Sequence, residues 1–341
     1  MPQVKTLWTG QLRCYDESGG EIACQGSGQD GETRCGEPWP ELRFVVEGEV
    51  VRDRLTDLIW SRTANPAGYP LMWQEAFDYI AAMNREQAFG HHDWRLPNRR
   101  ELRSLVSHQS HRPALPEGHP FGDLFPSWYW SSTTAAISPA HAWYVQMDGA
   151  RMFYGGKDQS FLVWPVRGTG NGHMAATGQT QCHDTHGGII NCQGSGQDGE
   201  LRCGKPWPIP RFVQQGEVLV DRLTNLAWRR SADLTGRAVK WMDALRAVQQ
   251  LNERQPYAGW RLPNINELES LVDCRMYTPA LPVGAVFTDL HGGYWSSTTS
   301  VYEPDWAWVL YLNKGAVGVG QKSGAYFHVW AVRSAVPRRQ I

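Results

Sequence analysis

Apolar residues recur with the spacing of a helix at two places in the chain. They are Trp73, Ala76, Phe77 and Ile80, followed by Asn84, and then Trp241, Ala244, Leu245 and Val248, followed by Asn252. Positions i, i+3, i+4 and i+7 share one helical face, so each stretch predicts an amphipathic helix. A shorter helix is predicted after each, because an asparagine stands three residues before a glutamate, as in a capping box. These capping pairs are Asn98 with Glu101 and Asn264 with Glu267.

The remainder of each half has the pattern of short strands. Aromatic and β-branched runs separated by Gly and Asp follow Pro113 and Pro279, which is typical of antiparallel strands. In the first half these runs cover 129–134, 142–147, 151–154 and 162–167. Two helices followed by a strand-rich core predict an α+β fold.

The whole pattern occurs twice in the chain, as an internal sequence repeat. The run 24–32 returns at 192–200, the run 94–98 returns at 260–264, and the run 129–134 returns at 294–299. We therefore divide the chain into a Cys/Gly-rich β subdomain (1–48), module 1 (49–168), a linker (169–178), a second Cys/Gly-rich β subdomain (179–216) and module 2 (217–335). The linker is assigned because it has small residues and no apolar periodicity.

Charge and hydropathy exclude several kinds of partner. The 341 residues contain 33 Lys+Arg and 34 Asp+Glu, a formal net charge of -1, so the chain lacks the positive field that draws proteins onto nucleic acid or anionic lipid. No run approaches the roughly 18 apolar residues of a membrane span. The first residues lack the layout of a secretory signal, so we expect a removed or replaced signal, or another route of export.

The cysteines form a repeated framework. They are Cys14, Cys24 and Cys35 in the first half, Cys182, Cys192 and Cys203 in the second, and Cys274 alone. The spacing is neither that of zinc ligands nor a redox C-x-x-C, and it favours disulfides formed in an oxidising compartment. We predict bridges from Cys14 to Cys24 and from Cys182 to Cys192. The alternative is a set of reduced, buried cysteines in a cytoplasmic protein.

Acidic residues accompany the Gly-rich turn beside these cysteines. They are Asp16, Asp30 and Glu32 in the first half and Asp184, Asp198 and Glu200 in the second. Calcium takes several oxygen ligands from a bent loop, so a calcium site is one hypothesis and the only cofactor that the sequence suggests. A hydrogen-bonded Asx-type turn is the alternative.

The tryptophan positions indicate which rings belong to the core shared by both halves and which lie at a surface. Seven pairs match between the halves, 39/207, 60/228, 73/241, 94/260, 130/295, 143/308 and 164/330, and we predict that they form the shared core. Trp8, Trp128 and Trp306 have no partner. An unmatched ring is not required by the common fold, which favours an interface or a ligand surface. For Trp306, in the loop that differs most between the halves, packing over that loop is the alternative.

Several ordered motifs resemble one bacterial domain family. They are Trp-Arg-Leu-Pro-Asn at 94–98 with Glu101, Tyr-Trp-Ser-Ser-Thr-Thr at 129–134, Val-Trp-Pro-Val-Arg at 163–167, and Asp-Arg-Leu-Thr at 53–56 with Trp60. The family, once a domain of unknown function, is named after the C-terminal domain of the Legionella collagen-like protein Lcl. The resemblance covers both halves. The segment 180–208 also resembles a short module that often precedes this domain.

The resemblance implies a fold akin to C-type lectins and to formylglycine-generating enzymes, so we expect two tandem C-type-lectin-like modules. The catalytic cysteine pair of that enzyme group is not reproduced, because Cys274 is the only cysteine inside either module. The residues show no Ser/His/Asp arrangement shared by both halves, and His91-His92-Asp93 has no titratable counterpart. We therefore predict no enzymatic activity. Family members implicated in adhesion bind glycans.

These inferences together predict a secreted or cell-surface protein that binds a glycan or a surface protein. The expected ligand-binding residues are aromatic or histidine side chains near the later strands: Tyr302, Trp306, Tyr311, Tyr326 and Phe327 in module 2, and His141, Tyr144, Phe153 and Tyr154 in module 1. Aromatic faces suit sugar rings and protein surfaces alike. The alternatives are a structural subunit of a surface layer or appendage, with the aromatic patch as a homo-oligomer interface, and a formylglycine-generating-like enzyme.

Overall fold

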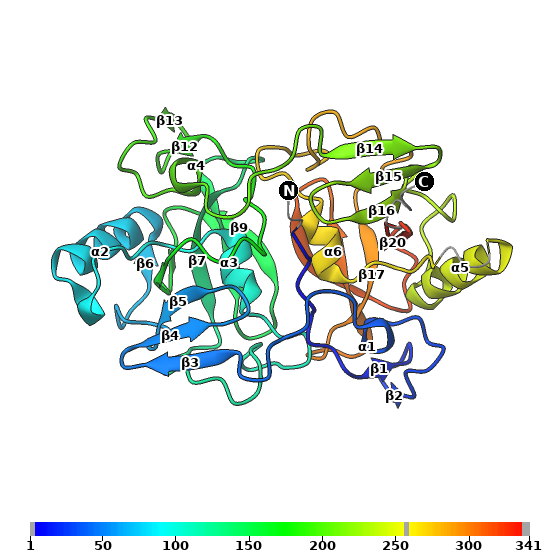
Figure 1. Cartoon of the computed structure of the whole chain (residues 1–341), viewed down its shortest axis with the longest axis horizontal. Helices are drawn as coiled ribbons and strands as arrows, with labels where there is room; N and C mark the ends of the chain where they lie inside the picture. The colour runs from blue at the N-terminus through cyan, green and yellow to red at the C-terminus, as the bar shows by residue number, and fades with distance from the viewer. Residues whose placement is uncertain (1–3, 256–258, 336–341) are drawn as a thin grey trace, which may run out of the picture. The chain divides into compact units, whose positions relative to one another are not determined.

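The computed structural model describes residues 4–255 and 259–335, and this part of the chain folds into two compact units. Unit 1 consists of residues 4–36, 207–272 and 278–335, with 256–258 outside the description. Unit 2 consists of 37–206 with Asp273–Tyr277. The beginning of the chain therefore packs with the second half of the sequence, as the blue segment beside the yellow and orange elements of Figure 1 shows.

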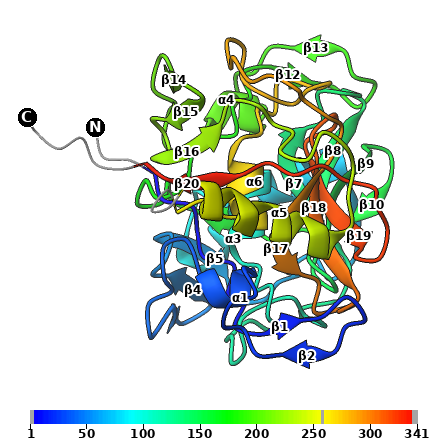
Figure 2. The same ribbon diagram turned by 90° about the vertical axis from the view of Figure 1, so that its right-hand side faces the viewer.

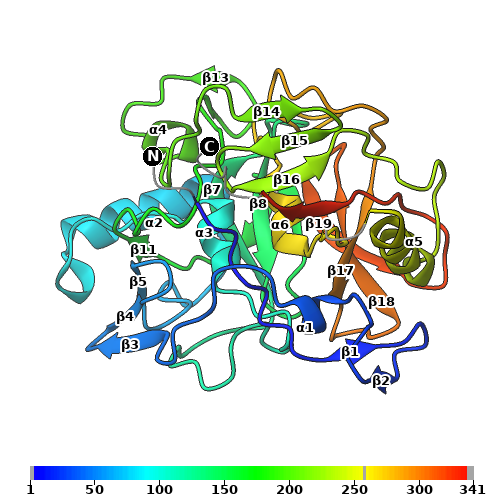
Figure 3. The ribbon, with the colours of Figure 1, turned by 45° about the vertical axis from the view of Figure 1, so that its right-hand side comes forward.

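Unit 1 combines two larger antiparallel sheets and the two-stranded β1-β2 sheet with two main helices. Its elements are β1 (Cys14–Tyr15), β2 (Glu21–Ile22), α1 (Asp30–Thr33), β14 (Phe212–Gln215), β15 (Val218–Asp221), β16 (Leu226–Arg229), α5 (Trp241–Arg254), α6 (Ile265–Ser270), β17 (Tyr294–Thr299), β18 (Trp306–Tyr311), β19 (Ala316–Gln321) and β20 (Val332–Ser334). The strands pair in the orders β14-β15-β16-β20 and β17-β18-β19. Figure 2 shows α5 lying across β17 to β19, and Figure 3 shows β20 beside β16.

Unit 2 repeats this plan. Its elements are β3 (Phe44–Glu47), β4 (Val50–Asp53), β5 (Leu58–Ser61), β6 (Leu71–Met72), α2 (Trp73–Arg85), η1 (Ala88–Gly90), α3 (Arg99–Ser104), β7 (Trp128–Thr134), β8 (His141–Gln146), β9 (Met152–Gly156), β10 (Ser160–Phe161), β11 (Val166–Arg167), β12 (Cys182–His183), β13 (Ile189–Ile190) and α4 (Asp198–Leu201). The main strand orders are β11-β5-β4-β3 and β7-β8-β9. The α+β class predicted from the sequence is confirmed.

The predicted helices are present, and their boundaries have local causes. The amphipathic stretches form α2 and α5, and the capping boxes begin α3 and α6. The asparagine that ends each apolar stripe binds the following tryptophan: the Asn252 side chain accepts the Trp260 N–H and donates to its carbonyl. The strand predicted for 162–167 is wrong in extent, because only Val166–Arg167 is a strand. Pro165 has no N–H to donate to a continuous ladder.

The Arg-Leu-Pro-Asn motif has a structural role at the start of the short helix in each unit. Arg261 forms a bidentate ion pair with Glu267, and the same carboxylate accepts the N–H of Asn264. The Asn264 side chain in turn accepts the N–H of Glu267 at 2.9 Å. Arg95, Asn98 and Glu101 repeat this arrangement in unit 2. The motif therefore fixes the start of the short helix.

Six of the seven matched tryptophan pairs are buried, as predicted for the shared core. The prediction is wrong for Trp39 and Trp207, which are only half-buried. Each instead lies against an arginine: the Arg43 guanidinium stands 5.0 Å from the Trp39 ring centroid, and that of Arg211 stands 4.6 Å from the Trp207 ring. The two arginines also pair with buried aspartates, so these rings cover an ion pair rather than fill a core.

The two predicted disulfides, Cys14–Cys24 and Cys182–Cys192, are both formed. Each closes a sequence separation of 10 residues beside a hairpin of two-residue strands. Cys35, Cys203 and Cys274 are not in disulfides. A bridge of this loop length stabilises a small subdomain by about 2–4 kcal/mol.

Each cysteine segment packs on the module of the other half of the sequence. Lys322 of module 2 donates to the Asp16 carbonyl at 3.0 Å, and its ammonium lies 4.2 Å from the Trp241 ring centroid. Lys157 of module 1 contacts the segment around the second disulfide, Cys182–Cys192, in the same way, through the carbonyl of Asp184. Burial lowers the pKa of both lysines to about 7. The sequence repeat gives no sign of this crossed pairing.

A buried carboxylate joins the first cysteine segment (residues 4–36) to module 2. Asp30 Oδ2 accepts the hydroxyls of Thr9 at 2.8 Å and Thr298 at 2.7 Å. Thr298 also accepts the N–H of Ile265, the first residue of α6. Burial is the main cause that raises the pKa of Asp30 to about 6. In unit 2, Asp198 holds the same place between Thr177 and Thr133.

This carboxylate predicts a pH-dependent stability. Because the folded pKa of about 6 exceeds the ordinary 3.8, the stabilising contribution of the protonated Asp30 is complete below about pH 4. This contribution to the free energy of unfolding, on the order of 3 kcal/mol, is lost as the pH rises through 6. Asp30→Asn cannot ionise and still accepts both hydroxyls, so we expect it to raise the melting temperature of unit 1 more at pH 8 than at pH 4.

Thermal unfolding of the variant and the parent at both pH values measures this effect. Asp198→Asn is the matched control, because it should act on unit 2 alone. An equal change in melting temperature at both pH values would show that Asp30 does not titrate in this range.

Candidate functional site

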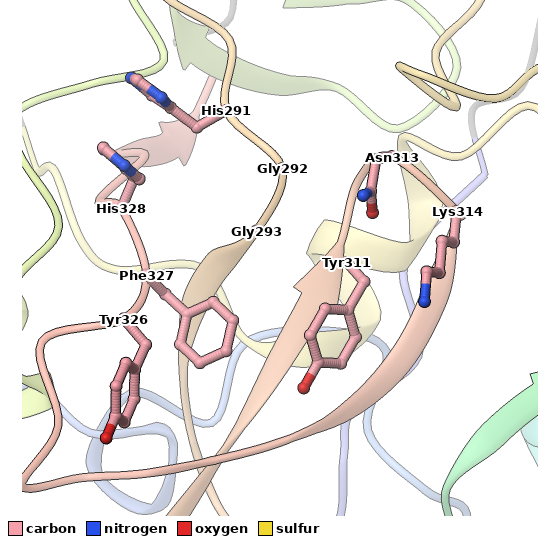
Figure 4. Close-up of a pocket in the computed structure, with 9 residues that line it drawn as sticks. All are labelled: His291, Gly292, Gly293, Tyr311, Asn313, Lys314, Tyr326, Phe327 and His328. Atoms are coloured by element: carbon pink, nitrogen blue, oxygen red, sulfur yellow. The ribbon is translucent and has the colours of Figure 1, made fainter.

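Module 2 carries a cavity of about 350 Å³ at the end of its β17-β18-β19 sheet. Its lining residues are His291, Gly292, Gly293, Tyr311, Asn313, Lys314, Tyr326, Phe327 and His328. Figure 4 shows the rings of Phe327 and Tyr311 side by side, with the two histidines beyond one end and Asn313 and Lys314 at the other. The cavity thus combines aromatic faces with polar groups at both ends, a composition that suits small-ligand sites.

Two glycines leave room for the Phe327 ring. A Cβ at Gly293 would stand 2.7 Å from this ring, and one at Gly320 would stand 2.3 Å from it, so a side chain at either position would displace the ring. Behind it the ring packs on Trp295, with centroids 4.8 Å apart. In module 1 the place of Gly293 is taken by Trp128, whose ring lies 4.4 Å from Tyr144. The substitution of glycine for tryptophan therefore opens the pocket in module 2.

The polar groups of the pocket differ in exposure. Lys314 is exposed in the turn between β18 and β19, and Asn313 beside it is half-buried. The Tyr311 hydroxyl donates to the Val319 carbonyl at 3.2 Å, which fixes the ring in the wall of the cavity. Tyr326 is 66% exposed and forms the outer wall. A ligand here would meet fixed rings inside the pocket and the exposed Lys314 ammonium at its rim.

The histidine end of the pocket contains a third polar residue, Asp233. His291 Nε2 lies 3.1 Å from Asp233 Oδ2, and His328 Nδ1 lies 3.3 Å from Oδ1. The imidazoles of His291 and His328 stack with centroids 3.5 Å apart and planes at 4°. The Tyr294 hydroxyl accepts the backbone N–H of His291 at 2.7 Å, and burial raises the pKa of Tyr294, so this anchor stays protonated.

The structure brings together only part of the predicted site in module 2. Tyr311, Tyr326 and Phe327 line the pocket, whereas Tyr302 and Trp306 do not. Trp306 begins β18 and Tyr311 ends it, so the two backbones stand roughly 17 Å apart. The loop before Trp306 packs on the first cysteine segment, where a Cβ at Gly19 would meet the Asp305 nitrogen at 2.9 Å.

The predicted residues of module 1 do not form one surface. Tyr144 lies on the side of β8 that faces the helix α2 core, against Trp130 and Phe161. Tyr154 packs instead on Trp143 and His141, at centroid distances of 5.2 and 5.9 Å. Phe153 is the direct partner of Tyr144 across the strand pair. Because successive strand residues point to opposite faces, the four side chains are divided between two sides of the sheet.

The carboxylates considered for calcium have other partners. Asp16 Oδ1 accepts the N–H groups of Ser18 and Gly20, both at 2.8 Å, and Asp184 repeats this turn in unit 2. Glu32 accepts the N–H groups of Gly26 and Gly28, as Glu200 does for its own loop. Asp30 and Asp198 accept threonine hydroxyls. Across residues 4–255 and 259–335, the one group of three possible metal ligands is Asp233, His291 and His328.

Sequence reasoning missed the histidine cluster and the polar end of the pocket. His291 and His328 stand 37 positions apart and meet because β17 forms a bridge between Tyr294 and His328. The sequence did contain a signal, because these residues differ between the halves. Leu162 of module 1 corresponds to His328, and Asn65 corresponds to Asp233. Comparing the two halves at His291, His328 and Asp233, as was done for Trp306, would have indicated these positions.

The two modules are tandem copies of one α+β domain, and module 2 has a pocket at one end of its sheet. The sequence model of the Lcl C-terminal domain matches residues 49–167 and again 217–333, more than half of the chain. The chain therefore belongs to the Lcl C-terminal domain family. The namesake, the Legionella collagen-like protein, is a bacterial surface protein. No curated protein compared with the chain gives a significant match.

Among the described residues, no helix is both long and apolar enough to cross a bilayer.

Proposed function

We propose that the chain is an exported, non-catalytic recognition protein of a bacterial surface that binds a glycan in the pocket of module 2. The observation that carries the proposal is the convergence of Tyr311, Tyr326 and Phe327 on one cavity, with hydrogen-bonding groups at both ends. Fixed aromatic faces match the C–H faces of a sugar ring, and polar groups around them match its hydroxyls. Membership in a family named after a surface protein supports the setting.

The charge of the pocket narrows the glycan class. Lys314 presents an exposed ammonium at the rim, and Asn313 beside it offers an amide. An ammonium binds carboxylate and sulfate groups through charge-assisted hydrogen bonds. We therefore favour an acidic sugar, such as a uronic acid or a sulfated residue, over a neutral one. Module 1 has no matching pair, because Asp148 and Gly149 stand in this turn.

Tyr326→Ala tests the proposal. Because the Tyr326 ring is 66% exposed, its loss should leave the melting temperature nearly unchanged. The affinity for an acidic glycan, chosen on a glycan array and titrated by calorimetry, should fall by about 2 kcal/mol, the usual size for an aromatic anchor. Tyr69→Ala, which removes a tyrosine of module 1 that is 60% exposed, is the matched control and should bind as the parent does.

Three results would count against the proposal. Unaltered affinity in Tyr326→Ala would remove the pocket from the binding site. A loss of affinity in Trp306→Ala alone would place the site at the opposite end of β18. Absence of any glycan binding, together with a smaller species in sedimentation for Tyr326→Ala, would favour the surface-layer alternative, in which the aromatic patch joins subunits.

A further inference from the structure

We infer that Asp233, His291 and His328 form a binding site for a divalent transition-metal ion of the zinc class. One ligand atom from each residue lies within 4.8 Å of the other two. Four ligands held tetrahedrally at 2.0–2.1 Å from zinc stand about 3.3 Å from one another. The two histidine-to-aspartate separations, 3.1 and 3.3 Å, are of this size. Two imidazole nitrogens and a carboxylate suit zinc, copper, iron or nickel better than calcium.

Hydrogen bonding within the cluster satisfies His291 Nε2, which lies 3.1 Å from Asp233 Oδ2, but not His328. The nitrogen His328 Nδ1 is buried and lacks a hydrogen-bond partner among the described residues, although Asp233 Oδ1 is 3.3 Å away. A buried polar nitrogen without a partner is unfavourable, because it has lost its hydrogen bonds to water. A metal ion between the two groups would accept the lone pair of this nitrogen and remove that cost.

The surroundings hold the ligands in place. Asp233 Oδ1 accepts the N–H of Gly236 at 3.0 Å, which orients the carboxylate. His328 donates its backbone N–H to the Gly293 carbonyl, and its own carbonyl accepts the N–H of Trp295, both at 3.1 Å. The Tyr294 hydroxyl fixes the backbone of His291. Such outer contacts orient ligands in metal sites.

The shared scaffold does not need these side chains. Leu162 of module 1 makes the backbone bonds that His328 makes in module 2, to Trp128 and Trp130. Asn65 stands where module 2 has Asp233, and the loop of His291 contains Phe125-Pro126 instead. The module folds with all three positions changed. The three ligands therefore serve a purpose specific to module 2, and one ion per chain is expected rather than two.

Three protein ligands leave at least one coordination position open. His291 is 36% exposed at its side chain and lines the pocket, so an ion can enter from that side. The open position would be filled by water. This inference does not depend on the proposed glycan binding, because the ion and the full chain alone are sufficient to test it.

Zinc titration of the chelator-treated full chain, followed by calorimetry, is the direct test. We expect one ion per chain, and binding at least about 100-fold weaker in His328→Leu and in Asp233→Asn. Both substitutions introduce the residue of module 1, so folding should be retained, and the melting temperature in the absence of metal checks this. His92→Ala, which removes an exposed histidine outside the cluster, should bind zinc as the parent does.

Cobalt substitution identifies the ligand atoms. The expected spectrum has visible d–d bands without the thiolate charge-transfer band that Cys35, Cys203 or Cys274 would produce. Absence of stoichiometric binding, unaltered zinc affinity in both cluster variants, or a thiolate band in the parent would each overturn the inference.

Discussion

Deletion of residues 1–36 is expected to destabilise unit 1 by on the order of 5 kcal/mol and to leave unit 2 unchanged. The deletion removes the Asp30 carboxylate from Thr298, both side-chain bonds between Gln11 and Thr299, and the carbonyl partners of Lys322. Two further bonds to carbonyls of the segment are lost from asparagines of module 2. Each such bond contributes about 1 kcal/mol.

Hydrogen exchange read by mass spectrometry separates the two units. Peptides from 217–333 should exchange faster in the deleted chain, whereas peptides from 49–167 should keep their protection. The opposite result, with loss of protection in 49–167, would mean that the segment packs on the module that follows it in the sequence. Lys322→Met is the milder companion variant, because it removes the same carbonyl contacts without shortening the chain.

The crossed pairing could not be predicted from the sequence, for a physical reason. Several side chains that attach the cysteine segments are the same in both halves: Lys157 matches Lys322, Thr133 matches Thr298, and Asp30 matches Asp198. At these positions either segment offers either module the same hydrogen bonds. These shared positions therefore do not distinguish the crossed pairing from the direct one, because the difference lies between segments far apart in the sequence.

Local structure was predictable because it depends on short-range causes. The capping asparagine of α6, Asn264, and the stripe that begins at Trp241 each act within one or two helical turns. The disulfides join cysteines in a short hairpin, so their spacing alone indicated the pairing. Sequence-based prediction failed where the burial of a single ring had to be inferred. Trp39, for example, covers Arg43 instead of entering the core.

The candidate site was predictable only in its aromatic part. Tyr326 and Phe327 stand together in the sequence, and Tyr311 was included as a strand aromatic, so composition was sufficient to select them. The glycine at 293 that admits the Phe327 ring, and the meeting of His291 with His328, arise from the register of β17 against the chain after β19. Register between distant segments is a property of tertiary structure.

Trp241→Ala is expected to lower the stability of unit 1 by about 3–5 kcal/mol, the usual cost of deleting a large buried ring. The Trp241 ring is fully buried at the start of α5, and its indole N–H donates to the Ser296 carbonyl at 2.7 Å. The alanine variant leaves a cavity and an unsatisfied carbonyl. It also removes the aromatic face from Lys322, so the contact with the first cysteine segment should weaken as well.

Chemical denaturation combined with hydrogen exchange measures this loss unit by unit. Trp207→Ala is the matched control within unit 1, because the Trp207 ring is half-buried against Arg211 and its removal should cost much less. Trp73→Ala should produce the same loss in unit 2, since its indole donates to the Ser131 carbonyl and carries Lys157 on its face. Equal effects of Trp241→Ala and Trp207→Ala would contradict the assignment of Trp241 to the core, and faster exchange in residues 4–36 in Trp241→Ala alone would confirm that this ring supports the crossed contact.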